Sequence, residues 1–194
     1  MANTVKYGLK NVYYAVATLG TSGAYTYTAP VAWPGAVSLS LDAEGGTTKF
    51  RADNVDYWVG QSNNGYSGDF ESALIPDGFR TAVLGDIVPE ESGTPLDIMI
   101  EDADAKTKYF ALLFQFEGDQ KAVKHVLYNC TATRPAIGSA TKEDTVEPET
   151  ETVTITATSI YSETLQSDIV KARSNKDTDG TTYDAWFNTV YLPT

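Results

Sequence analysis

The side chains best suited to nucleophilic or acid–base chemistry are scarce in this sequence. His125 is the only histidine and Cys130 the only cysteine, and both fall within one apolar, β-branched segment. A histidine base needs a nucleophile within hydrogen-bond reach, and no serine occurs in the Gly-x-Ser-x-Gly pattern that presents one at a sharp turn. We therefore predict that His125 is a structural residue of a sheet.

Carboxylates, in contrast, are abundant, and two of them across a sugar can hydrolyse a glycosidic bond. Asp69 and Glu71 would share one face of a strand, because side chains alternate along a strand with a period of two. Among 26 acidic residues, however, a pair of this kind arises by chance. A glycosidase is therefore the weakest of the functional interpretations.

Two short motifs could hold a metal ion or a glycan. Residues 175–180 (Asn-Lys-Asp-Thr-Asp-Gly) match the first half of a calcium loop, but its twelfth position falls on Trp186 instead of a glutamate. We predict an Asp-Gly turn there, with no metal and no cofactor. Asn129-Cys130-Thr131 fits the glycosylation acceptor pattern, but no secretion signal precedes it.

Composition favours one domain made in a reducing compartment. The 194 residues are 42% hydrophobic, which suffices for a core, and a lone thiol is typical of cytoplasmic folding. We find neither a signal peptide nor an apolar run long enough for a membrane helix. The net charge of −12 disfavours tight binding of nucleic acid, although an acidic wall would let DNA slide past.

Alternating and β-branched segments predict a mainly β fold, a β-sandwich or open barrel of two packed antiparallel sheets with one short flanking α-helix. The clearest strand covers residues 37–42, and we expect 43–46 to turn the chain so that 47–51 returns beside it. A second hairpin, predicted to form the core, joins 108–116 to 121–128. Weaker strand signals cover 7–16, 56–59, 68–73, 97–101, 152–160 and 169–173.

The one predicted helix begins at Pro76 and ends at Gly85. Pro76 suits the first helical position, and Gly85 can adopt the left-handed conformation that ends a helix. Phe79, Ala82 and Val83 would share its apolar face.

Two further stretches have unusual charge. Residues 11–41 contain no charged side chain, and their middle part, 18–35, has the composition of a loop. Cover by a neighbouring molecule and a buried hairpin with small polar turns both remain open for this loop. Residues 141–151 carry five acids around Pro148, which predicts a solvated linker.

Four segments, in order and spacing, resemble the major tail (tail tube) protein of long-tailed bacteriophages of Gram-positive bacteria, the phi13-type family. Residues 5–15 (VKYGLKNVYYA) look like its entry strand, and 75–85, from Ile-Pro-Asp-Gly-Phe-Arg to Leu-Gly, look like its flank helix. Residues 144–152 are similar to its entry into the final strands, and 183–193 to its C-terminal element. The match spans nearly the whole chain.

This resemblance implies a non-enzymatic virion protein, made in the host bacterial cytoplasm, that closes into hexameric rings. The rings stack into a hollow tail tube through which the genome and the tape-measure protein pass, without specific DNA binding or membrane contact. The tail terminator and the distal tail protein are further implied partners. Residues 1–194 would form one tail-tube domain with an N-terminal arm (1–10), a long uncharged loop (18–35), an acidic linker (141–151) and a C-terminal element (175–194).

Self-assembly would use strand edges for ring closure and the arm, loop and C-terminal element for stacking. Large aromatic side chains commonly carry interface energy. The expected inter-subunit residues are Tyr7, Leu9, Tyr25, Tyr27, Trp33, Trp186 and Phe187. Core packing is the alternative for Tyr25, Tyr27 and Trp33. A competing interpretation is a carbohydrate- or receptor-binding module in which Trp33, Trp58 and Trp186 are stacking platforms.

Overall fold

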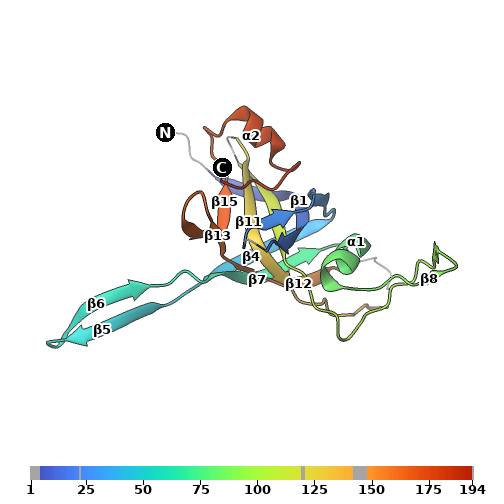
Figure 1. Ribbon diagram of the computed structural model, residues 1–194, viewed down its shortest axis with the longest axis horizontal. Helices are drawn as coiled ribbons and strands as arrows, with labels where there is room; N and C mark the ends of the chain where they lie inside the picture. The colour runs from blue at the N-terminus through green and yellow to red at the C-terminus, as the bar shows by residue number, and fades with distance from the viewer. Residues whose placement is uncertain (1–4, 22, 119–120, 142–147, 194) are drawn as a thin grey trace.

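The computed structural model describes residues 5–21, 23–118, 121–141 and 148–193, and its fold is mainly β, as predicted (Figure 1). The strands are β1 (Lys6–Leu19), β2 (Tyr25–Tyr27), β3 (Val31–Ala32), β4 (Ala36–Glu44), β5 (Thr47–Ala52), β6 (Val55–Gln61), β7 (Gly65–Ser72), β8 (Glu90–Glu91), β9 (Thr94–Pro95), β10 (Phe110–Gly118), β11 (Val123–Ala132), β12 (Glu151–Thr158), β13 (Ile160–Ser162), β14 (Ser167–Ile169) and β15 (Lys171–Arg173). The helical segments are α1 (Asp77–Phe79), the π-helical turn η1 (Arg80–Leu84) and α2 (Gly180–Ala185).

One antiparallel sheet forms the body, with the strand order β2-β1-β10-β11-β12-β7-β4. Two short strands extend it, β3 on β1 and β15 on β11. The sheet curls until β4, at one end of this order, approaches β1, next to the other end, without pairing with it, which makes an open barrel. The predicted core hairpin is confirmed as β10 and β11, whose register places Phe114 opposite His125.

Apolar residues on both faces of this sheet are buried, which explains the continuous apolar runs of β10 and β11. The inner layer is Val12, Tyr14, Trp33, Phe70, Ile75, Phe79, Val83, Leu84, Phe110, Leu112, Phe114, Leu127, Cys130, Ala132, Val153, Ile155 and Ala157. The outer layer is Ala15, Ala111, Leu113, Val126, Tyr128, Ile160 and Trp186. Part of the C-terminal element covers the outer layer, so this element packs on its own subunit.

The predicted short helix is confirmed as α1 and η1. It ends at Gly85, whose φ of 85° is left-handed, while Pro76 is the residue before the helix rather than its first. The Phe79 ring packs in the inner layer, and its centroid lies 4.3 Å from that of Trp33. The carboxylate of Glu151 accepts hydrogen bonds from Ile75 N (2.7 Å) and Arg80 Nη2 (3.0 Å), so it ties the helix to β12.

The predicted hairpin of 37–42 with 47–51 is wrong. β4 pairs with β7, and β5 pairs with β6, so residues 43–46 do not turn the chain. The turn lies at Asp53 and Asn54, which have φ values of 52° and 63° between the paired residues Ala52 and Val55. Two left-handed residues form the turn that matches the twist of a two-residue hairpin.

Several other sequence expectations need correction. Residues 97–101 form no strand and contribute only an isolated bridge between Ile87 and Ile100. The expected Asp-Gly turn is instead the start of α2, where Asp179 accepts a hydrogen bond from Thr182 N. The uncharged loop contains β2 and β3, which pair with β1.

The described parts of the expected arm and linker belong to the body. Residues 6–10 belong to β1 and lie beside β10, while 1–4 fall outside the described residues. Of the acidic linker, 142–147 fall outside them. Within its described part, Glu149 accepts a hydrogen bond from Ala140 N (2.5 Å) and Glu151 begins β12.

Candidate assembly surface

His125 and Cys130 are packed structural side chains. The His125 ring stacks on Phe114 at 5.0 Å, and burial, followed by the charges of Lys171, Arg173 and Lys6, lowers the pKa of His125 to about 4. Cys130 is completely buried, which raises the pKa of its thiol to about 12. Within the described ranges, no group of three or more His, Cys, Asp or Glu residues could hold a metal ion.

The carboxylate pair lacks the electrostatics of an acid catalyst. Glu71 accepts hydrogen bonds from Thr150 (2.6 Å) and Ser38 (2.9 Å), and these lower the pKa of its carboxyl group. A glycosidase acid needs a raised pKa. Asp69 accepts a hydrogen bond from Thr154 (2.8 Å), so both acids serve cross-strand bonds on an exposed face.

The two remaining motifs are also used structurally. The Asn129 amide donates to Thr158 Oγ1 (2.8 Å) from a buried position in β11, where it is closed to glycan transfer. In 175–180, Asn175 Oδ1 accepts a hydrogen bond from Asp177 N (2.8 Å), which forms a local turn before α2.

Two expected interface anchors belong to the subunit's own core. Trp33 is only 2% exposed, and its Nε1 donates to Ser72 Oγ (3.1 Å). Trp186 is 3% exposed, and its Nε1 donates to the carbonyl of His125 (3.3 Å). The assignment of these two rings to an interface is therefore corrected to core packing. The same burial removes two of the three platforms of the sugar-binding interpretation and leaves Trp58.

The other expected interface residues lie at or near the surface. Tyr7 is exposed, and Leu9 is half-buried. Tyr25, Tyr27 and Phe187 pack partly against the outer layer, and the Tyr27 hydroxyl donates to the backbone of β11 (3.0 Å). Tyr7 and Leu9 thus belong to the first part of β1, whereas Tyr25, Tyr27 and Phe187 lie against the outer layer.

The most prominent exposed apolar surface is one that sequence analysis missed. β5 and β6 form a two-stranded ribbon, residues 47–61, that projects far from the body (Figure 1). Five of its large apolar side chains are exposed, namely Phe50 (59%), Val55 (57%), Tyr57 (71%), Trp58 (56%) and Val59 (51%). Patches of this kind on a soluble protein mark interaction sites.

The two faces of the ribbon differ in chemistry. Phe50 lies directly opposite Trp58 in the register of β5 and β6, so one face of the ribbon carries two aromatic side chains. On the other face Asp56 binds both Lys49 (2.7 Å) and Arg51 (2.8 Å). The ribbon contains two basic and two acidic residues in all. Its formal charge is therefore zero, in a chain of net charge −12.

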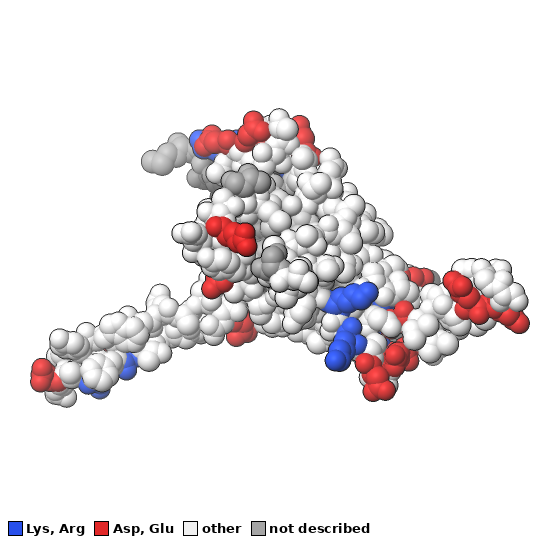
Figure 2. All heavy atoms as spheres, in the orientation of Figure 1, with Lys and Arg blue, Asp and Glu red and all other residues white. Residues whose placement is uncertain are grey.

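A second projection, which we call the acidic loop, comprises residues 86–104 at the opposite end of the molecule (Figures 1 and 2). It carries seven acids and no lysine or arginine, together with the exposed side chains Ile87, Leu96, Ile98 and Ile100. Arg134 holds its base, donating to Asp86 Oδ1 (2.9 Å) and to the carbonyl of Asp102 (3.0 Å).

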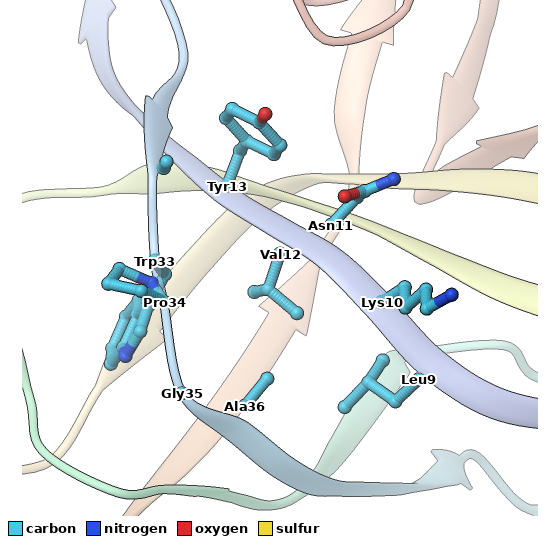
Figure 3. A pocket seen from close by; sticks show the side chains of 10 residues that line it. Leu9, Lys10, Asn11, Val12, Tyr13, Trp33, Pro34, Gly35 and Ala36 are labelled. Atoms are coloured by element: carbon cyan, nitrogen blue, oxygen red, sulfur yellow. The ribbon is translucent and has the colours of Figure 1, made fainter.

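At the open seam of the barrel, β1 and β4 do not pair with each other in the described part of the chain. A pocket of about 280 Å³ lies at the seam, between residues 9–13 of β1 and residues 32–36 (Figure 3). β1 is irregular here, with positive φ at Gly8 (64°) and Asn11 (50°). Among the described strands none covers the outer edge of β4, which is therefore available to another strand.

Comparison with known proteins adds no assignment, since no protein-family model, no curated protein and no solved structure matches the chain. No helix in the described ranges is long and apolar enough to cross a membrane.

Proposed function

We propose that the protein is a structural subunit that assembles with copies of itself into hexameric rings, and that these rings stack into the tail tube of a long-tailed phage. The observation that carries this proposal is the ribbon, whose aromatic face is left uncovered by its own subunit. Copies of the chain can cover such a surface at every position of a regular array.

Two further features support the proposal. The edge of β4 that no described strand covers is a template for strand pairing, and pairing around a closed ring would leave no edge exposed. The net charge of −12 suits a conduit whose wall must not bind phosphates, because the genome and the tape-measure protein have to pass through it. Such a subunit would be made in the bacterial cytoplasm and reside in the virion.

The proposal is tested by electron microscopy of the purified protein over a concentration series, in comparison with a ribbon deletion. Ser62 N donates to the carbonyl of Gly46 (2.9 Å), so a short turn replacing residues 47–61 would leave the pairing of β4 with β7 intact. Wild type should form rings or tubes, and the deletion should stay a folded monomer. Tyr161→Ser, at an exposed site on β13, is the control and should assemble normally. A wild-type chain that stays monomeric at millimolar concentration would refute the proposal.

A further inference from the structure

A slot of about 240 Å³ opens on the inner side of the barrel. One wall comes from β4 and β7, and the other from β10 and β11. Its lining is Lys6, Leu39, Leu41, Tyr66, Phe114, Phe116, His125, Leu127 and Lys171, and we call it the cationic slot. Apolar walls with a few charged groups are the usual composition of a binding site.

The charges at this slot have no acidic counterpart. Lys6 Nζ lies 4.6 Å from the Phe116 ring and Lys171 Nζ lies 4.2 Å from the Tyr66 ring, while Arg173 stands opposite His125 in the register of β11 and β15. Within the described chain, Lys6, Lys171 and Arg173 form no ion pair with a carboxylate. The slot therefore suits a ligand with an apolar group beside an anionic group.

The acidic loop has this chemistry. Ile98 is 55% exposed, and the adjacent Asp97 forms no ion pair with any described residue. Arg134 fixes the base of the loop, so the loop is presented as a projection with a defined position. An aliphatic side chain next to a free carboxylate matches both the walls and the charge of the slot.

The slot and the loop cannot meet within one subunit. Leu41 and Tyr66 lie on the parts of β4 and β7 that lead into and out of the ribbon, whereas the acidic loop projects from the other end of the body (Figure 1). A contact between them must join two copies, and it uses different surfaces on each, so it repeats from copy to copy.

We propose that the acidic loop of one copy docks on the cationic slot of the next, with Ile98 against the apolar walls and Asp97 facing Lys6, Lys171 and Arg173. This contact rests on the proposed self-assembly and specifies which surfaces meet. Since it is partly electrostatic, added salt should weaken it.

A charge exchange tests the contact. Lys171→Glu and Asp97→Lys should each weaken association about tenfold or more, measured by sedimentation velocity, and the double variant should recover most of the loss. Lys176→Glu makes the same charge change at an exposed lysine that does not line the slot and should associate like wild type. Circular dichroism would establish that every variant is folded.

The outcomes separate this contact from the proposed function. If Lys171→Glu forms tubes like wild type and the control, the slot–loop contact is refuted while tube assembly stands. If wild type itself fails to associate, both proposals fail. Saturable binding of dodecanoate to the slot, abolished by Lys171→Glu without any effect on assembly, would assign the slot to a small amphiphile and would also overturn the contact.

Discussion

The six-membered ring of Trp58 occupies the space in which a side chain at position 60 would stand. A Cβ atom on Gly60 would lie 2.2 Å from Cη2 of Trp58, far inside van der Waals contact. The two residues lie on the same face of β6, because they are two positions apart in a strand. The absent side chain at position 60 thus lets the indole lie along the ribbon.

Replacing Gly60 by alanine should drive the Trp58 ring off this position. The ribbon lies outside the core, so we expect the free energy of unfolding to change by less than about 1 kcal/mol. Tube formation, seen by electron microscopy, should be lost. Gly138→Ala adds a methyl group where nothing lies within 4 Å and serves as the control. Normal tubes from the Gly60 variant would show that the position of the indole is irrelevant to assembly.

Trp33→Ala should destabilise the isolated subunit. Removing a large buried aromatic side chain costs about 3–5 kcal/mol, and here Ser72 also loses the indole as a hydrogen-bond donor. Urea denaturation of the monomer measures this loss. Leu19→Ala, at an exposed position, should stay within about 0.5 kcal/mol of wild type. A variant with intact monomer stability but defective assembly would return Trp33 to an interface.

Glu151→Ala should loosen the helix from β12. It removes the acceptor for the amide of Ile75 and for the guanidinium of Arg80, and an unpaired group at a partly buried site costs about 1–3 kcal/mol. Chemical denaturation would measure the loss, with Glu163→Ala at an exposed position as the control. Equal stability of the two variants would show that the hydrogen bonds of Glu151 to Ile75 and Arg80 contribute nothing to the free energy of unfolding.

His125 should make the subunit less stable in acid. Its pKa is about 4 in the fold and near 6.5 in the unfolded chain, so only the unfolded state takes up the proton between these values. Stability should therefore fall as the pH drops from 6.5 to 4 and lose no more through this group below pH 4. The full shift corresponds to about 3 kcal/mol, and solvent screening of the partly exposed ring reduces it.

His125→Phe, which keeps a ring against Phe114, should show a smaller loss of unfolding free energy between pH 7 and pH 4 than wild type. The carboxylates titrate in both proteins, so the difference isolates the histidine. Identical pH profiles would contradict the lowered pKa.

Local sequence patterns predicted the strands and the helix better than they predicted which strands pair with each other. The alternation in 37–42 and the glycine-ended helix are properties of neighbouring residues, and both are present. The partner of β4 depends on which edges remain after the sheet curls, and sequence spacing carries no such information. Asp53-Asn54 was the available signal for the true turn, because these residue types tolerate positive φ.

The candidate surfaces were harder to predict than the fold. The aromatic segment of β6 reads as an ordinary strand, and only the structure shows that it stands away from the body. The cationic slot joins residues from six strands, between Lys6 and Lys171, that no motif connects. In the uncharged loop Trp33 lies in the subunit's own core, whereas the other described residues of 18–35 are exposed or half-buried.

The sealed position of Cys130 has a practical consequence. The only native thiol is fully buried and its pKa is raised, so it stays protonated and out of reach of alkylating reagents at neutral pH. A cysteine introduced at the tip of the ribbon would then be the only reactive thiol of the protein. Fluorophores or gold clusters could be attached at one chosen point without first removing a natural residue.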